Sequence, residues 1–173
     1  MRISIVAAVT LDGKIAQSVD QLSLEWTSKE DKRFFVKKTK EAGVLIMGRS
    51  TYDTIGRPLP KRLNIIMTRS PEKFEGEEGV LEYTKETPQE ILERLHAKGF
   101  EEVIIAGGAQ IYGLFLKASL VTDLFLTIEP VIFGKGVPLV EGIDPVNLTL
   151  VNQEKLGEHA VLLHYRIPDH LTT

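Results

Sequence analysis

The chain has 173 residues, of which 43% are hydrophobic and 26% are charged, and its formal net charge is −3. These values are typical of a soluble globular protein with a sizeable core, and they provide no overall attraction to nucleic acid or to membranes. The absence of cysteine excludes disulfides, thiolate catalysis and zinc–cysteine sites. Because the sequence shows no signal peptide and no apolar segment of membrane length, we expect a cytoplasmic protein.

The first 42 residues predict a strand, a turn, a loop and a helix, in that order. Residues 3–9 are apolar and β-branched, as in a central strand, and LDGK at 11–14 is typical of a turn. The polar, irregular segment at 17–25 predicts a mobile loop. A helix is expected over residues 29–41, because Thr27 or Ser28 can cap it and acidic residues occupy its first turn.

Asp31, in the first turn of this helix, has two interpretations. It can be a solvated acid that interacts favourably with the helix dipole. Alternatively, its carboxylate faces a cleft together with Phe35, which lies one helical turn further along the same face. A carboxylate in that position could bind the edge of an amidine-like ring through two hydrogen bonds.

Residues 43–70 predict two buried strands, each followed by an arginine. The strand at 44–47 leads through Gly48 and Arg49 into a short helix, and the strand at 63–68 is followed by Arg69. Ligands of open α/β sheets bind at such strand ends, and a helix N-terminus beside an arginine suits phosphate. The segment therefore indicates a phosphorylated cofactor.

Arg62 and the pair Gly107-Gly108 each have a functional and a purely structural interpretation. Arg62 follows a stiff Pro-Leu-Pro turn and could bind a substrate carboxylate, or it could be a surface arginine. Gly107 and Gly108 separate a predicted strand at 102–106 from a predicted helix at 109–117. They either let phosphates approach backbone N–H groups or form a tight turn that binds nothing, and a full G-x-G-x-x-G motif is absent.

The rest of the chain completes the pattern of alternating strands and helices. Further segments are a charged loop at 71–79, a strand at 80–83, a helix to about residue 98, a strand at 122–128, a loop at 130–145, an antiparallel hairpin at 148–153 and 160–167, and a frayed tail at 169–173. This order predicts an α/β fold with a mostly parallel central sheet of about eight strands and an antiparallel C-terminal hairpin. The four histidines lack the spacing of metal ligands, so no metal site is expected.

Taken together, several segments resemble the dihydrofolate reductase family. The motif W-x4-D-x3-F at Trp26, Asp31 and Phe35 occurs in the family's order and spacing, as do MGRSTYDTIGRPLPKRLNIIMTRS at 47–70, IAGGAQIY at 105–112 and LFLTIE at 124–129. The resemblance covers about residues 1–130. It implies a single three-layer α/β domain over residues 1–173. It also implies NADPH-dependent reduction of 7,8-dihydrofolate to 5,6,7,8-tetrahydrofolate, by hydride transfer to pterin C6 with protonation at N5.

The resemblance further implies roles for individual substrate-site residues. Asp31 would bind the pterin and support protonation of N5, Thr127 would hydrogen-bond its carboxylate, and Trp26 would hold an ordered water. Arg62 would bind the α-carboxylate of the glutamate tail. The implied substrate site comprises Val6, Ala7, Asp31, Phe35, Ile55, Leu59, Arg62 and Thr127.

NADPH is the cofactor that the resemblance implies. Arg49 and its neighbours match the family's phosphate-binding turn, while Thr68 and Arg69 fall near the adenosine 2′-phosphate. The implied cofactor site comprises Ala8, Ile15, Gly48, Arg49, Ser50, Thr51, Thr68, Arg69, Ser70, Ala106, Gly107, Gly108, Ala109, Gln110, Ile111 and Tyr112.

A second resemblance leaves other functions open. LDGKIA at 11–16 and PVIFGKGVPLVEG at 130–142 are similar to the reductase domain of riboflavin biosynthesis. The alternatives are therefore a 5-amino-6-(5-phosphoribosylamino)uracil reductase and a non-catalytic NADPH-binding protein. A folate reductase would have dihydrofolate and antifolates such as methotrexate as partners. Both a monomer and a homodimer are compatible with the sequence.

Overall fold

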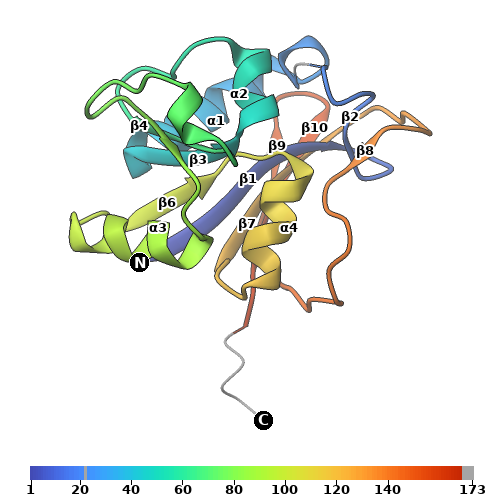
Figure 1. Ribbon diagram of the computed structural model, residues 1–173. Helices are drawn as coiled ribbons and strands as arrows, with labels where there is room; N and C mark the ends of the chain where they lie inside the picture. Colours follow the sequence, from blue (N-terminus) through green and yellow to red (C-terminus); the bar gives the residue numbers. More distant parts are fainter. Residues whose placement is uncertain (22, 169–173) are drawn as a thin grey trace.

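The computed structural model describes residues 1–21 and 23–168, which form a twisted sheet with helices on both faces (Figure 1). The predicted tail at 169–173 lies outside the described residues. Eight strands make the main sheet, in the order β5-β4-β3-β6-β1-β7-β10-β9. They are β1 (Arg2–Thr10), β3 (Val44–Gly48), β4 (Leu63–Met67), β5 (Leu81–Thr84), β6 (Glu102–Ile105), β7 (Asp123–Glu129), β9 (Thr149–Leu156) and β10 (Ala160–Arg166).

The first six strands in this order are parallel, and the last two are antiparallel to their neighbours. β1 pairs in parallel with β6 and β7, and β3 pairs in parallel with β4 and β6. The C-terminal strand β10 runs antiparallel to both β7 and β9. The predicted mostly parallel sheet of about eight strands with an antiparallel C-terminal hairpin is confirmed.

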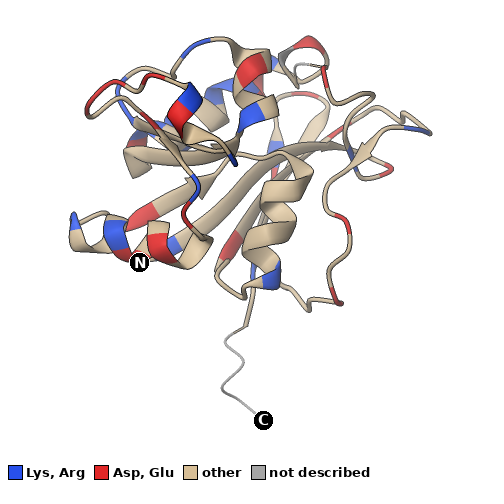
Figure 2. Cartoon of the chain, in the orientation of Figure 1, with Lys and Arg blue, Asp and Glu red and all other residues tan. Residues whose placement is uncertain are grey.

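Four α-helices cover the sheet, two on each face. They are α1 (Lys29–Ala42), α2 (Arg49–Ile55), α3 (Pro88–Ala97) and α4 (Ala109–Lys117). Buried residues of α3 and α4 share one hydrophobic cluster with strand residues such as Ile5, and residues of α1 and α2 pack on a second cluster that contains Val6. Because side chains alternate along a strand, Val6 and Ala7 point to opposite faces. Figure 2 shows that α4 carries no charged residue before its C-terminal end.

The helix α1 begins and ends as its sequence predicts. The Ser28 hydroxyl accepts a hydrogen bond from the Asp31 N–H, which caps the N-terminus. The C-terminus ends at Gly43, whose φ of 74° is left-handed and favours glycine. The predicted cap thus places Asp31 in the first helical turn.

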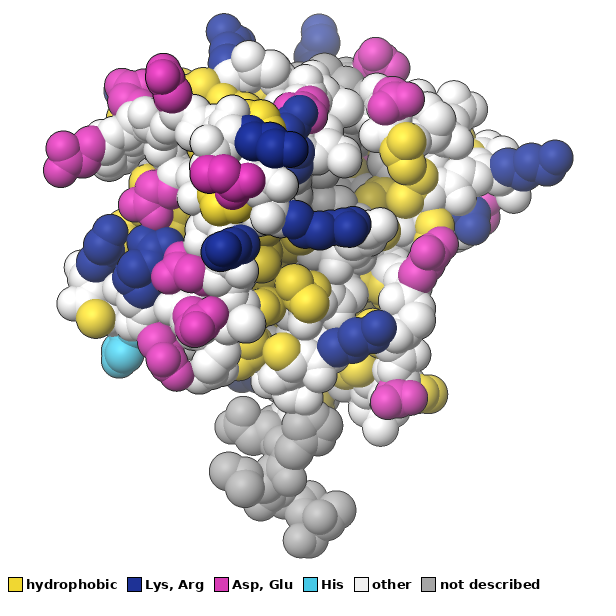
Figure 3. Space-filling view, in the orientation of Figure 1, with side chains coloured by type: hydrophobic (Ala, Val, Ile, Leu, Met, Phe, Trp, Pro, Cys, Tyr) yellow, Lys and Arg dark blue, Asp and Glu magenta, His cyan; other side chains and the backbone are white. Residues whose placement is uncertain are grey.

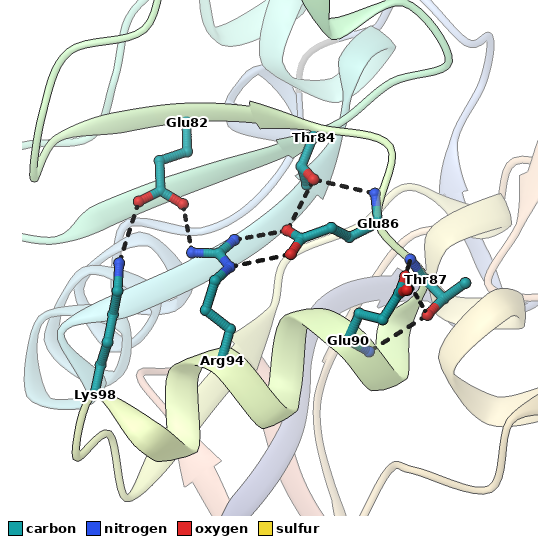
Figure 4. Close-up of polar contacts among 7 residues, drawn as sticks. All are labelled: Glu82, Thr84, Glu86, Thr87, Glu90, Arg94 and Lys98. Carbon is teal, nitrogen blue, oxygen red and sulfur yellow. Dashed lines mark hydrogen bonds and ion pairs between the residues drawn. The ribbon is translucent and has the colours of Figure 1, made fainter.

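Ion pairs fasten α3 to the edge strand β5 (Figure 4). Arg94 contacts Glu82 and Glu86, each at 2.8 Å, and Lys98 lies 3.6 Å from Glu82. Thr87 begins the helix, and its side chain and that of Glu90 form a reciprocal capping box. These contacts hold α3 against β5, and α3 is followed in the chain by β6.

The strands β3 and β6 are neighbours in the sheet, but the helices that follow them lie on opposite faces. α2 follows β3 on the face of α1, whereas α4 follows β6 on the face of α3. Such a reversal opens a crevice at the carboxyl ends of the strands, where open α/β sheets bind ligands. The fold therefore places Gly48 and Gly107 at a ligand-binding position.

A second, two-stranded sheet was not predicted. It pairs β2 (Lys14–Ala16), which begins at the end of the predicted turn, with β8 (Val137–Pro138), which lies in the segment 130–145 that was expected to be only a loop. Strands this short carry no readable periodicity, and their pairing depends on contacts between distant loops. Two short 3-10 helices, η1 (Ser23–Glu25) and η2 (Pro71–Lys73), were also not predicted. In the described part of the chain no helix is both long and apolar enough to cross a membrane.

Candidate active site

Asp31 is a buried acid, with only 8% of its surface exposed. Burial raises the pKa of its carboxyl group, hydrogen bonds with the Thr127 and Thr27 side chains lower it, and the nearby charge of Glu129 raises it further; the net change is upward. The interpretation of Asp31 as a solvated first-turn acid is therefore wrong. Its carboxylate faces the protein interior beside Thr127, as the sequence resemblance implies.

Trp26, just before α1, carries a buried polar atom that needs an acceptor. Its indole Nε1 has no hydrogen-bond partner among the residues described by the structure. The ring packs edge-on against Phe133, with 5.1 Å between ring centroids. Buried N–H groups are nearly always satisfied in folded proteins, so this one suits a bound water or ligand atom.

The predicted apolar wall assembles on one face of the sheet. Val6, Phe35, Ile55 and Leu59 belong to or pack against the same hydrophobic cluster. The side chain of Ala7 belongs to the cluster on the opposite face. Any contact of Ala7 with a ligand on the Val6 face would therefore be made by its backbone.

Arg62 is almost completely buried, with 6% of its surface exposed, and so it is not a surface arginine. Its Nε donates to the Pro60 carbonyl at 3.0 Å, and its Nη1 donates to the hydroxyl of Thr39 on α1. Burial lowers its pKa. No acidic side chain pairs with Arg62 among residues 1–21 and 23–168. A buried cation without an acidic partner is suited to an anionic ligand group.

Asp31, Phe35 and Thr39 occupy the same face of α1, at intervals of four residues. At a rise of 1.5 Å per residue, Asp31 and Thr39 are separated by about 12 Å along the helix axis. Since Arg62 is bonded to Thr39, this face has an acid at one end, an arginine at the other and an aromatic ring between them.

Glycines bring the starts of α2 and α4 together. Gly48 N–H donates to the Gly107 carbonyl at 2.8 Å, and neither helix has a side-chain cap. A Cβ atom on Gly107 would lie 2.8 Å from the Tyr112 hydroxyl, and one on Gly108 would lie 3.3 Å from the Thr51 hydroxyl. Gly107 also has a φ of 101° and precedes a cis peptide bond to Gly108. Uncapped N–H groups beside a surface without side chains suit a pyrophosphate.

Tyr112 connects this glycine-lined cradle to the acid. Its hydroxyl donates to the Val6 carbonyl at 3.3 Å, and the side chain is buried. Burial and the charge of Asp31 both raise the pKa of the Tyr112 phenol, so it remains protonated. The cradle and Asp31 thus lie within electrostatic reach of each other.

Arg49, expected at a phosphate, contacts Asp53 and Phe74 of its own chain. Its Nε lies 2.6 Å from the Asp53 carboxylate on the same helix, and its guanidinium stacks over Phe74 at 4.3 Å. Arg69 is exposed, and Thr68 next to it bonds to Thr84 through its backbone. The assignments of Arg49 to the phosphate-binding turn and of Arg69 to the 2′-phosphate stay predictions.

The other predicted cofactor residues belong to several elements of the fold. Ala8 pairs with Thr127 in the sheet, and Ile15 and Ile111 pack on the Tyr112 cluster. Ala106 packs on the opposite cluster. The remaining positions are Ser50 on α2, Ser70 before η2, and Ala109 and Gln110 in the first turn of α4.

Sequence reasoning missed three residues that make contacts in this part of the molecule: Thr27, Glu129 and Asp12. Thr27 bonds to the Asp31 side chain, and Glu129 accepts two hydrogen bonds from Ser28. Asp12 accepts hydrogen bonds from the Phe133 and Gly134 N–H groups, which ties two loops together. The sequence could have predicted that Glu129 lies near the acid, because it follows Thr127 by two residues and so points to the same face of β7. The contact of Asp12 with Phe133 spans 121 residues and leaves no local signal.

Figure 3 shows hydrophobic side chains gathered over α4, with both basic and acidic side chains around them. The hydrophobic patch suits a ligand with apolar rings.

Comparison with known proteins supports the sequence resemblance. A family model described as dihydrofolate reductase matches residues 2–136. The dihydrofolate reductase of Haemophilus influenzae is 31% identical over 127 residues, which cover 73% of this chain and 71% of that enzyme. The uncharacterized protein YwjB of Bacillus subtilis is 28% identical over 167 residues, which cover 91% of this chain and 93% of that protein.

Two solved structures share the fold of this chain. A Shewanella sp. PV-4 protein with a provisional assignment to riboflavin biosynthesis has a TM-score of 0.84 at 24% identity, covering 97% of this chain and 99% of that chain. A Thermotoga maritima protein named as a diaminohydroxyphosphoribosylaminopyrimidine deaminase and 5-amino-6-(5-phosphoribosylamino)uracil reductase has a TM-score of 0.79 at 18% identity, covering 96% of this chain and 56% of that chain. At such identities the similarity establishes the shared fold.

Proposed function

The chain belongs to the dihydrofolate reductase family, and we propose that it reduces 7,8-dihydrofolate to 5,6,7,8-tetrahydrofolate with NADPH as the reductant. The observation that carries this proposal is the position of Asp31 and Arg62 at the two ends of one face of α1. A buried acid suits the amidine-like edge of a pterin, and a buried arginine suits the carboxylate of a glutamate tail. Phe35 and its apolar neighbours suit the ring between those two groups.

The glycine-lined cradle supports a dinucleotide cofactor. The uncapped N–H groups at the start of α4 would hold the pyrophosphate, because they concentrate positive charge there. The absence of a side chain at Gly107 and Gly108 leaves room for the cofactor to approach the backbone. When bound, NADPH supplies the hydride for pterin C6. The protein itself must hold the two rings together and exclude water.

Asp31 supplies the proton chemistry in this proposal. Its raised pKa lets the carboxyl group hold a proton at a higher pH than an ordinary aspartic acid does. Thr127 and Thr27 fix the orientation of the carboxylate, so it can bind the pterin edge and favour protonation at N5. The unsatisfied Trp26 Nε1 is a donor that could hold an ordered water beside it.

A direct assay tests the proposal. Purified protein mixed with NADPH and dihydrofolate should lose absorbance at the reduced-nicotinamide band, and methotrexate should block the loss by competing for the Asp31 site. If the protein binds NADPH tightly but does not oxidise it with dihydrofolate, the proposal is wrong; a non-catalytic binding role is then the better description only if the uracil substrate considered next is not consumed either.

A second candidate is reduction of 5-amino-6-(5-phosphoribosylamino)uracil. It is favoured by the similarity in fold to the Thermotoga maritima protein and by the segment at 130–142, whose sequence resembles that of riboflavin-pathway reductases. In that reaction Arg62 would bind the substrate phosphate instead of a carboxylate. Offering both substrates separately to one preparation distinguishes the candidates, since only the true substrate should be consumed at a useful rate.

A further inference from the structure

Glu129, the last residue of β7, is a buried acid to which the proposed mechanism assigns no role. Only 3% of its surface is exposed. Its Oε1 accepts two hydrogen bonds from Ser28, one from the backbone N–H at 2.8 Å and one from the hydroxyl at 2.7 Å. No basic side chain pairs with it within the described ranges 1–21 and 23–168. Burying a carboxylate without a basic partner costs free energy, which the two hydrogen bonds from Ser28 partly offset.

Those contacts lead to Asp31. Ser28 caps α1, and its hydroxyl, which donates to Glu129, also accepts from the Asp31 N–H at 3.2 Å. Thr127, two residues before Glu129 on the same face of β7, hydrogen-bonds the Asp31 side chain. The strand therefore contacts the first turn of α1 at two points, one at the cap and one at the acid.

We propose that Glu129 is a positioning residue for Asp31: by holding Ser28 it fixes the first turn of α1 on β7 and keeps the Asp31 carboxylate against Thr127. The inference rests on the proposed function only in taking Asp31 as the acid of the reduction. The placement itself depends on the two hydrogen bonds to Ser28.

The charge of Glu129 has a second effect. After burial, the nearby carboxylate of Glu129 contributes to the raised pKa of Asp31, whereas Lys32 acts in the opposite direction. Glu30, Glu158 and the His159 imidazole line, together with Glu129, a cavity of about 480 Å³ between α1 and the β9–β10 turn. Glu158 is largely exposed and carries a charge at the same cavity without a hydrogen bond to Ser28, so it serves as the control.

Two variants separate the positioning from the charge. Glu129→Gln keeps an oxygen that can accept from Ser28 but removes the charge, whereas Glu129→Ala removes both. Glu158→Gln removes a charge from the same cavity without touching Ser28. In the ligand-free protein, ¹³C NMR would follow the Asp31 carboxyl signal, which Asp31→Asn identifies by its disappearance. The pH profile of kcat would be measured in parallel.

We expect Glu129→Gln to retain kcat within a few-fold, while the Asp31 titration and the alkaline fall of kcat both move to lower pH. Glu129→Ala should lower kcat by roughly 100-fold, as expected for a misplaced reacting group, with NADPH affinity unchanged. Glu158→Gln should resemble the unmodified protein in both measurements.

A Glu129→Ala variant with full kcat, or with an Asp31 carboxyl signal identical to that of the unmodified protein, would overturn the inference. So would a loss of kcat in Glu129→Gln as large as that in Glu129→Ala, because the Gln side chain keeps an acceptor for Ser28. If the protein reduces no dihydrofolate at all, the proposed function fails, but the NMR titration still decides the relation between Glu129 and Asp31.

Discussion

Arg62 and Asp31 mark opposite ends of one face of α1, because Arg62 is hydrogen-bonded to Thr39, eight residues beyond Asp31. Both side chains are buried, and Asp31 and Thr39 are separated by about 12 Å along the helix axis. Because Asp31 and Arg62 lie at opposite ends of this face, each can bind a different end of one ligand. This relationship sets the first predictions.

Replacing Asp31 with Asn should leave the fold intact but slow the reduction of dihydrofolate by about 10²–10⁴-fold, the range that general acid–base groups contribute. The loss should be most severe at neutral to high pH, where protons in solution cannot substitute for the acid. Steady-state kinetics between pH 5 and 9 would measure it, with NADPH affinity as the control. Near-unchanged turnover would remove Asp31 from its role.

The same substitution should stabilise the protein at neutral pH. The pKa of Asp31 is higher in the folded protein than in the unfolded chain. The contribution of Asp31 to the free energy of unfolding is therefore fully present below its pKa in the unfolded chain, and it is lost as the pH rises through its pKa in the folded protein. Thermal unfolding of Asp31→Asn against the unmodified protein should therefore show a gain in Tm at pH 7 that disappears on acidification. Glu30→Gln, in the same helical turn but more exposed, should show no such trend.

Arg62→Met should raise KM for dihydrofolate about 10–150-fold, since a hydrogen bond to a charged group contributes about 1.5–3 kcal/mol. NADPH affinity should not change, and a pterin substrate without the glutamate tail should be almost unaffected. The exposed Arg57 on the same loop offers a control, Arg57→Met. Equal losses for substrates with and without the tail would argue against the assigned contact.

Gly107→Ala should weaken NADPH binding and cost about 1–3 kcal/mol of stability, because alanine is strained at a φ of 101° and its Cβ would lie 2.8 Å from the Tyr112 hydroxyl. Gly79→Ala is a matched control, with a φ of 72° but open space around the added atom. Adding Tyr112→Phe should recover part of the loss. A Gly107→Ala protein with full NADPH affinity would show that the cradle is not where the cofactor binds.

Arg94→Met should destabilise the fold by about 1–2 kcal/mol, given a half-buried pair of contacts to Glu82 and Glu86. The hydrogen bond from Arg94 is the main cause that lowers the pKa of Glu86 in the folded protein. The stabilisation by this contact is therefore present above the pKa that Glu86 has in the unfolded chain, and it is lost as the pH falls through the pKa of Glu86 in the folded protein. Urea unfolding at pH 7 and pH 4 would measure both effects. Arg33→Met, which removes an exposed 4.0 Å contact to Glu30, should cost almost nothing.

The predictable parts of this protein are those whose signals are local. The helix α4 has the predicted bounds Ala109–Lys117, and α1 starts after Ser28, one of the two predicted caps. The buried strands were read from short apolar runs, and their alternation with helices determined the parallel sheet. Asp31, Phe35 and Arg62 could be chosen as candidates because helical spacing and a stiff turn are visible in the sequence.

By itself, then, the sequence determined the elements, their order and the candidate residues, since caps, turns and periodicity act over a few residues. Only the tertiary structure decided which candidates are buried and what they contact. Glu129 meets Ser28 across 101 residues, Asp12 meets Phe133 across 121, and Arg62 is a buried cation only because it packs on Thr39. Such contacts depend on how distant segments pack, and that packing sets the burial and the pKa of Asp31.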